Sequence, residues 1–208
     1  MTLRVVLATR NAGKVREIRE IAADYPGIDI VGLDDVGIPE SPDEDDIEAF
    51  ETFEENALAK ARYFARLSNE LTLADDSGIC IDALGGAPGV HSRRFAQRGD
   101  LRGPDQDHAN NELVVQLLQG REGAERAAQY VCAAALAWPD GREEVVRGTC
   151  EGVLLHEPRG TGGFGYDPLF FMPEEDATFG ELAPERKNVV SHRGKAVRRA
   201  LEVLRNQG

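Results

Sequence analysis

The chain has 208 residues, of which 37 are acidic and 24 basic, so its formal net charge at pH 7 is −13. This balance argues against a binder of duplex nucleic acid, which normally carries the opposite charge. No apolar run approaches the ~20 residues of a membrane-spanning helix, so we expect no membrane contact. Three scattered cysteines predict neither a disulfide framework nor a structural zinc site, and they favour a reducing, cytoplasmic setting.

The pattern of apolar residues predicts an α/β protein without a clean domain boundary, so we expect a single domain over residues 1–208. The apolar run from Leu3 to Thr9 predicts a buried first strand rather than a signal peptide. A helical pattern follows from Lys14 to about Ala23, and Ile28 to Val31 predicts a second strand. A strand, a helix and a strand in this order are typical of α/β folds.

The middle of the chain begins with an exposed acidic loop, from Glu40 to the capping-box residues Thr52 and Glu55. The capping box predicts a helix from about Phe53 to Arg66. The remaining elements that we expect are strands Leu71–Ala74, Ile79–Ala83, Ala128–Ala137, Glu143–Leu155 and Pro168–Met172, and helices Asn110–Leu118 and Ser191–Leu204. The two long strands share the hairpin signal Pro139-Asp140-Gly141.

The first candidate motif is the loop from Thr9 to Lys14, between the first strand and its helix. Such a loop can present backbone N–H groups and a positive helix end to a phosphate, to which Lys14 adds a charge. It is not a P-loop, because Ala8 stands where the first glycine belongs and Val15 where Ser or Thr holds magnesium. The alternative is an ordinary strand-to-helix turn eased by Gly13.

The second motif, Gly160 to Gly165, spells the G-x-G-x-x-G pattern of dinucleotide-binding proteins. A dinucleotide fingerprint must open a helix, whereas an extended apolar run follows here, so we reject that interpretation. What remains is a glycine loop carrying Phe164, Tyr166 and Asp167. Its aromatic rings either stack on a flat base or pack into the core.

The third motif, Asp75-Asp76-Ser77-Gly78, stands at the expected end of an apolar strand. Two adjacent carboxylates repel by about 4 kcal/mol at ~4 Å and an effective dielectric of 20. A divalent cation removes that cost, and hard oxygen ligands favour magnesium. The alternative is a solvated turn. The acidic run around Glu48 and Glu51 either lends another ligand or is a solvated loop.

Two sets of cations stand beside this acid. Asn56 and Lys60 share one helix face, and Lys60 either makes surface pairs or points into a polyphosphate site. His192 and Arg193 lie in the first turn of the last helix, where the positive dipole end disfavours cations. Either an anionic ligand or the chain's own excess acid must therefore neutralise them.

Five segments stand in order over nearly the whole chain, from about Val5 to Leu204. They are LATRNAGK, TFEENALAKA, LADDSGICIDALGGAPGVHS, GTGGFGYDPLFF and ELAPERKNVVSHRGKA. Together they resemble the inosine triphosphate pyrophosphatase family, also called XTP/dITP diphosphatases. The resemblance implies an α/β fold with a long central mixed β-sheet flanked by helices and two lobes around a deep substrate cleft. It also implies Mg²⁺-dependent hydrolysis of ITP, dITP and XTP to the monophosphate and pyrophosphate, by a homodimer.

The resemblance also assigns roles to residues. Asp76 is the catalytic base and a metal ligand, and Glu48 is the second metal ligand, with Glu51 as the alternative. The implied substrate-binding residues are Thr9, Arg10, Asn11, Ala12, Gly13, Lys14, Ser77, Phe164, Gly165, Tyr166, Asp167, Lys187, His192 and Arg193. We add Lys60, whose charge would offset that of the phosphates. Arg10 is a departure, since the family often carries glycine at this position.

Donors from Lys187, His192 or Arg193 would favour the 6-oxygen of hypoxanthine and xanthine over the 6-amine of adenine. Two other functions compete with this one. The first is a broader nucleotide pyrophosphatase that acts on other modified nucleotides, and a substrate panel would distinguish the two activities. A nucleotide-binding module without turnover would need no water-activating carboxylate, and the intact DDSG motif argues against it.

Overall fold

The computed structural model describes residues 2–207 of the chain, without the side chains of residues 45 and 207. Within these residues the strands form one seven-stranded sheet in the order β2-β1-β3-β4-β5-β6-β7. The strands are β1 Leu3–Leu7, β2 Ile28–Gly32, β3 Thr72–Ile81, β4 Ala127–Ala137, β5 Glu143–Leu154, β6 Phe170–Met172 and β7 Ala177–Thr178. The α-helices are α1 Ala12–Ala22, α2 Phe53–Ser68, α3 Gly103–Leu117, α4 Pro184–Val190 and α5 His192–Gln207. Short 3-10 helices cover Asp34–Val36, Pro42–Asp46, Asp82–Leu84, Gly89–Arg94 and Gly123–Arg126.

The sheet is mixed, as the resemblance implied. Strand β1 pairs in parallel with β2 and with β3, whereas β6 pairs antiparallel with both β5 and β7. A tight turn joins β4 to β5, in which the Trp138 N–H donates to the Arg142 carbonyl over 3.0 Å. The chain divides into two compact units. The first comprises the described residues up to Asp76, Cys132–Gly148, and those from Asn188 onward, and the second comprises Ser77–Val131 and Thr149–Lys187.

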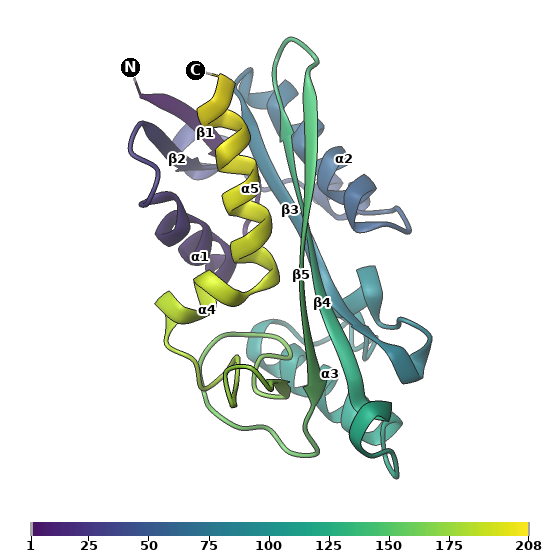
Figure 1. Cartoon of the computed structure of the whole chain (residues 1–208). Helices are drawn as coiled ribbons and strands as arrows, with labels where there is room; N and C mark the ends of the chain where they lie inside the picture. The colour runs from purple at the N-terminus through teal and green to yellow at the C-terminus, as the bar shows by residue number, and fades with distance from the viewer. Residues whose placement is uncertain (1, 208) are drawn as a thin grey trace. The chain divides into compact units, whose positions relative to one another are not determined.

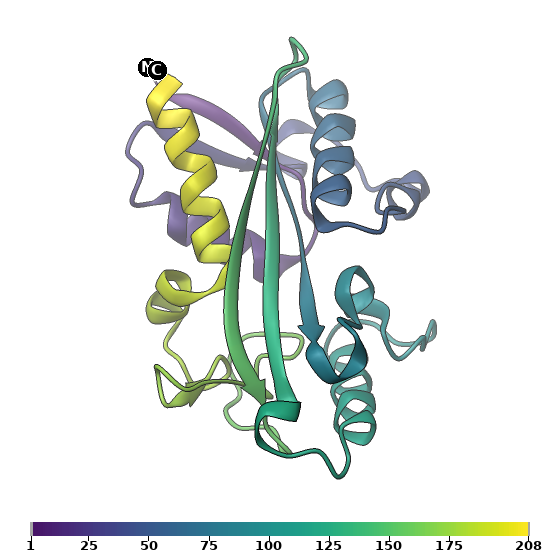
Figure 2. The ribbon, with the colours of Figure 1, turned by 45° about the vertical axis from the view of Figure 1, so that its right-hand side comes forward.

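In the first unit, helices cover both faces of the sheet. Figures 1 and 2 show α1 and α5 side by side on one face and α2 on the other. Val5 and Leu7 of β1 pack with Ile18 of α1 and Leu201 of α5 in one buried cluster. Because successive side chains of a strand point to opposite faces, the buried Val6 lies on the α2 side.

In the second unit, an aromatic cluster and a buried arginine organise the core. Tyr130 meets Phe170 edge-on at a centroid distance of 4.7 Å and stacks on Phe179 at 5.7 Å. The guanidinium of Arg126 is buried and donates to the carbonyls of Leu118, Leu154 and Leu155 at 3.0, 2.6 and 2.7 Å. Burial lowers the pKa of Arg126, and these three carbonyls compensate part of that cost.

Two expectations about the elements were wrong. The DDSG motif does not end a strand, because β3 runs without interruption for 10 residues through Asp75 and Asp76. The expected helix at Asn110–Leu118 begins instead at Gly103, with Pro104 in its first turn. Helix α4 and strand β7 were not expected at all. In the described part of the chain, no helix is long and apolar enough to cross a membrane.

Candidate functional site

Strand β3 presents its two adjacent aspartates to different helices of the first unit. Asp75 has no exposed surface and contacts side chains from α1 and α5, whereas Asp76 is hydrogen-bonded to α2. The period-two alternation of a strand produces this division. The pair is therefore held inside the first unit by partners that come from distant parts of the sequence.

Asp75 is neutralised by two cations. Its Oδ2 lies 2.9 Å from Lys14 Nζ and 3.3 Å from Arg193 Nε. Burial alone would raise the pKa of Asp75, but the charges of Lys14 and Arg193 outweigh it and hold that pKa well below its usual range. Asp75 is therefore ionised at neutral pH and serves as an internal counter-ion for the two cations. The thiol of Cys132 lies 3.9 Å from the same oxygen, and burial raises the pKa of that thiol.

The pKa of Asp76 is shifted in the opposite direction from that of Asp75. Burial raises the pKa of Asp76, even though Lys14 and Lys60 act to lower it, and the charge of Glu48 raises it further. The side-chain amide of Asn56 donates to Asp76 Oδ2 over 3.1 Å. The same amide donates to the carbonyl of Phe50 and accepts from its N–H, at 3.1 and 2.9 Å. Asn56 thus joins the end of the acidic loop to Asp76.

Glu48 and Lys60 form an ion pair beside Asp76. Burial disfavours both charges, yet attraction between them lowers the pKa of Glu48 and raises the pKa of Lys60. Lys60 also responds to Asp75 and Asp76. Of the two roles that the sequence left open for Lys60, the structure places it in this buried cluster rather than in a surface pair.

The loop before α1 holds the helix start. Asn11 is the N-cap of α1 and its side-chain oxygen accepts from the Lys14 N–H over 3.1 Å, while Thr9 Oγ1 accepts from the Asn11 N–H over 3.2 Å. Arg10 turns to a different partner: its guanidinium binds Glu44 in a two-pronged contact at 2.8 and 3.0 Å. That contact, together with a bond of 3.1 Å to the Ile38 carbonyl, occupies Arg10 within the chain.

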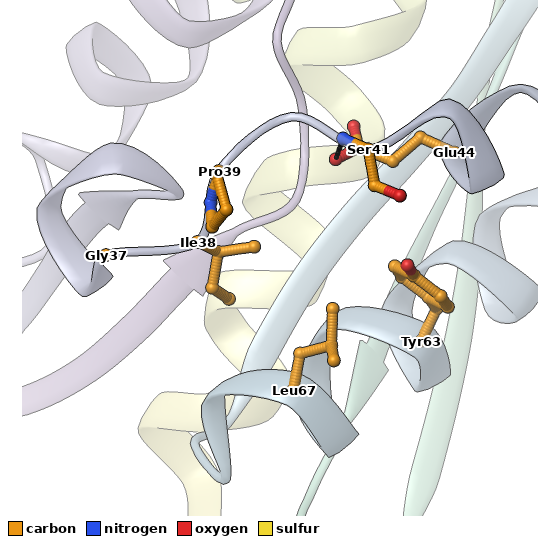
Figure 3. Close-up of a pocket in the computed structure, with 7 residues that line it drawn as sticks. All are labelled: Gly37, Ile38, Pro39, Ser41, Glu44, Tyr63 and Leu67. Carbon is orange, nitrogen blue, oxygen red and sulfur yellow. Dashed lines mark hydrogen bonds between the residues drawn. The ribbon is translucent and has the colours of Figure 1, made fainter.

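Figure 3 shows the pocket that lies beside this contact. It measures about 280 Å³, and Tyr63 and Leu67 of α2 face Ile38 across it. The figure also shows the Ser41 N–H donating to Glu44, at 3.1 Å. Of the predicted site residues none lines this pocket, so it does not belong to the carboxylate and lysine cluster.

The start of α5 is buried, and the charge of Arg193 is neutralised by the chain's own acid. Arg193 forms an ion pair with Glu17 of α1 in addition to Asp75, and these carboxylates raise its pKa against the effect of burial. The Gly194 N–H donates to Ser191 Oγ over 3.1 Å, as the expected cap requires. His192 is also buried, and a Cβ added at Gly148 would lie only 2.2 Å from the His192 carbonyl oxygen.

In the second unit, Asp167 gathers the glycine loop and a lysine. Its Oδ2 lies 2.6 Å from Lys187 Nζ and accepts from the Phe164 N–H over 2.8 Å. The Lys187 ammonium stands over the Phe164 ring, 5.1 Å from its centroid. Gly163 is required here, because it has a φ of +73° and a Cβ would lie 2.0 Å from Asp167 Oδ2. The loop thus presents one aromatic face beside one ammonium.

The two aromatic residues of this loop differ in burial. Tyr166 is buried and its hydroxyl donates to the Ser92 carbonyl over 2.8 Å, and burial raises its pKa. Phe164 is half-buried. Of the alternatives that the sequence left open, core packing therefore holds for Tyr166, while Phe164 keeps exposed surface on which a base can stack.

The structure thus assembles nine of the predicted residues in two groups, one in each unit. The first holds Lys14, Glu48, Lys60, Asp76 and, through Asp75, Arg193; the second holds Phe164, Gly165, Asp167 and Lys187. Sequence reasoning missed Glu17, although its spacing of four from Ile21 places it on the apolar face of α1. It also missed Asp107 and Asn111 of α3, which bind Gly165.

The residues present fit a magnesium ion by the chemistry of their donors. Asp76 and Glu48 supply hard carboxylate oxygens, and they interact closely enough for the charge of Glu48 to raise the pKa of Asp76. No group of three or more potential ligands occurs in the described residues. Magnesium is usually held by one or two carboxylates together with substrate phosphates and water, so two carboxylates meet its requirement.

The fold and the side-chain cluster on β3 define an α/β protein with a mixed sheet and a buried site of carboxylates and lysines. A model of the Ham1 family matches residues 5–203, and the chain belongs to that family.

Named relatives match the chain over nearly its whole length. A dITP/XTP pyrophosphatase of Desulforamulus reducens is 46% identical over 203 residues, which cover 97% of this chain and 96% of that protein. A dITP/XTP pyrophosphatase of Streptomyces avermitilis is 49% identical over 205 residues and 97% of both chains. The solved structure of a HAM1 protein from Coxiella burnetii is 35% identical, with a TM-score of 0.83 over 99% of this chain and 100% of that one. The family and the α/β fold expected from the sequence are thereby confirmed.

Proposed function

We propose that this protein hydrolyses deaminated purine nucleoside triphosphates such as dITP, ITP and XTP, releasing the monophosphate and pyrophosphate. The observation that carries the proposal is Asp76, a buried carboxylate with a raised pKa beside two lysines. A carboxylate with a raised pKa accepts a proton more readily than an ordinary one, which suits a general base. The names of the relatives, dITP/XTP pyrophosphatase, support the substrate class.

In the proposed reaction, Asp76 orients a water molecule towards the α-phosphorus and accepts its proton. Asn56 holds Asp76 through Oδ2, which leaves its orientation fixed. The bond from the α-phosphorus to the bridging oxygen breaks, and pyrophosphate leaves with that oxygen. The ammonium groups of Lys14 and Lys60 offset the negative charge on the phosphates. Both already lie in this cluster, where they pair with carboxylates.

We assign Asp76 and Glu48 as the residues that hold Mg²⁺. When bound, the ion would supply a Lewis acid that draws charge from the phosphate oxygens. Lys60 pairs with Glu48, which keeps that carboxylate charged and in place. The ligand that the sequence left open between Glu48 and Glu51 is therefore assigned to Glu48, whose side chain belongs to the cluster.

The purine base is assigned to Phe164 and Lys187 of the second unit. The exposed part of the Phe164 ring offers a stacking surface, and the Lys187 ammonium is a donor without acceptor capacity. A 6-oxygen accepts from such a donor, whereas the 6-amine of adenine would oppose it. Asp167 fixes the position of Lys187 and so sets the direction of this donor.

We also propose that the protein acts as a homodimer, from family membership, and that it works in the cytoplasm, from its few scattered cysteines. Sedimentation velocity at micromolar concentration tests the first part. A species of two chains is the expected result, and a stable single chain would contradict it.

The proposed function is tested by pyrophosphate release from dITP, ITP, XTP, dATP and dGTP, with and without Mg²⁺. We expect the first three to be hydrolysed at least a hundredfold more efficiently than dATP, whose 6-amine opposes the Lys187 donor. Guanine shares the 6-oxygen, so dGTP measures discrimination at position 2 of the base. Asp76→Asn should lower the rate by 10² to 10⁴, the order typical for loss of a general base. Asp140→Asn, at the exposed turn between β4 and β5, is the matched control and should keep the wild-type rate. Equal rates in Asp76→Asn and Asp140→Asn would remove Asp76 from the mechanism.

A further inference from the structure

Two side chains of α3 hold the backbone of Gly165, in the glycine loop of the second unit. Asp107 Oδ2 accepts from the Gly165 N–H over 2.8 Å, and Asn111 Nδ2 donates to the Gly165 carbonyl over 3.0 Å. Asp107 and Asn111 are four residues apart and so lie on one face of the helix. Both hydrogen-bonding groups of Gly165 are therefore engaged by one face of α3.

This contact fixes a piece of backbone that has no strand pairing of its own. Gly165 has a φ of +62°, in the left-handed region that favours glycine. The N–H of the preceding residue, Phe164, is held by Asp167. The peptides on both sides of the Phe164 ring are thus bound by carboxylates, which restricts the direction in which the ring can point.

Helix α3 is itself anchored, so it can serve as a fixed support. Asn110 is buried and its side-chain amide donates to the carbonyls of Ser92 and Arg93 at 3.2 and 3.1 Å. Its oxygen accepts from the Ala96 N–H over 2.9 Å. Asn110 ties α3 to the neighbouring 3-10 helix, while Asp107 and Asn111 reach the glycine loop.

The polar face carries a cost that packing does not explain. Asp107 lies near the charge of Asp167 and is partly buried, and both effects raise its pKa. Asn111 Oδ1 is buried and has no hydrogen-bond partner among the described residues. Apolar side chains would remove both costs if this face served only to pack. Local rules are often broken at functional sites, and here the gain is the defined position of Gly165.

We propose that Asp107 and Asn111 are positioning residues of the reaction, which fix the Phe164 to Asp167 turn in the conformation that receives the purine base. The inference rests on the proposed function, because it takes the base to lie against Phe164 and Lys187. It predicts that loss of either contact weakens nucleotide binding and base discrimination. The proton-transfer residues belong to the first unit, so kcat should change less than KM.

The test uses variants that separate the acceptor role of Asp107 from the donor role of Asn111. Asp107→Ala and Asn111→Ala should each raise KM for dITP at least tenfold, with kcat within about threefold of the wild type. Asp107→Asn keeps an acceptor for the Gly165 N–H, so its KM should lie within about threefold of the wild-type KM. Asn111→Asp places an acceptor against the Gly165 carbonyl and should be at least as harmful as Asn111→Ala.

The same helix supplies matched controls. His108 and Glu112 form an exposed pair with the same spacing, one residue further along α3. His108→Ala and Glu112→Ala should keep the wild-type KM and the wild-type ratio of dITP to dATP turnover. In Asp107→Ala and Asn111→Ala the ratio of dITP to dATP turnover should fall at least fivefold. A merely structural role of these residues would lower the melting temperature and leave that ratio unchanged.

Amide hydrogen exchange keeps the inference testable where a variant is inactive. Exchange at Gly165 should accelerate at least tenfold in Asp107→Ala but not in His108→Ala. Wild-type KM, base ratio and Gly165 exchange in both alanine variants would overturn the inference. If the wild-type protein hydrolyses none of the deaminated nucleotides, the proposed function fails, and the exchange at Gly165 still decides whether Asp107 holds this peptide.

Discussion

Replacing Arg193 by methionine tests the electrostatic core of the first unit most sharply. The guanidinium is 4% exposed and is paired with Glu17 and Asp75, of which Asp75 has no exposed surface. Removing one partner of a buried ion pair costs about 3–5 kcal/mol, because it leaves buried charge that is less well compensated. For a chain of this size each kcal/mol shifts the melting temperature by about 2–4 °C. Arg193→Met should therefore lower it by roughly 6–20 °C.

The control lies on the same helix. Arg198 pairs with Asp24 at 2.8 Å, with side chains 29% and 63% exposed, and exposed pairs contribute at most about 1 kcal/mol. Arg198→Met should thus shift the melting temperature by no more than about 4 °C. Thermal melting followed by circular dichroism at pH 7 measures both variants. Equal shifts in the two variants would refute the buried network, since the expected difference between them comes from burial alone.

Three further predictions concern single side chains. Glu48→Gln should raise the Mg²⁺ concentration needed for half-maximal pyrophosphate release at least tenfold, whereas Glu51→Gln should not; the reverse result would assign the ligand to Glu51. Arg10 holds the pKa of Glu44 below its ordinary value of 4.5. The stability that this ion pair contributes is therefore fully present above pH 4.5 and is lost as the pH falls through the lowered pKa of Glu44. The difference in melting temperature between wild type and Arg10→Met should accordingly shrink between pH 6 and pH 3, and a constant difference would contradict the pairing. Tyr166→Phe removes a buried hydrogen bond and should cost about 1–3 kcal/mol in urea unfolding, while an unchanged midpoint would contradict that bond.

The elements that local sequence patterns determine were predicted well. The capping box at Thr52 starts α2, with the Thr52 oxygen accepting from the Glu55 N–H over 3.2 Å. Ser191 caps α5 as expected. The start of α3 was missed although Pro104 in the first turn is itself a helix-start signal, because the polar stretch that follows it has no apolar periodicity.

The continuity of β3 depends on partners far away in the sequence and could not be predicted locally. Asp75 and Asp76 suggest a turn by residue type, yet Lys14 and Arg193 supply the charges that allow Asp75 to stay in a buried strand. Arg193 and Glu17 are 176 residues apart. The sequence indicates that cations at the start of α5 need a counter-charge, but only the structure identifies that of Arg193 as acid from the chain itself.

In the proposed reaction, Asp76 activates water for attack on the α-phosphorus. Single-turnover hydrolysis of dITP in ¹⁸O-labelled water, with the products separated and weighed by mass spectrometry, tests it most directly. We expect one ¹⁸O atom in dIMP, none in pyrophosphate, and a rate at least a hundredfold lower in Asp76→Asn. Label in pyrophosphate, release of orthophosphate, or an Asp76→Asn rate equal to that of the wild type would contradict it.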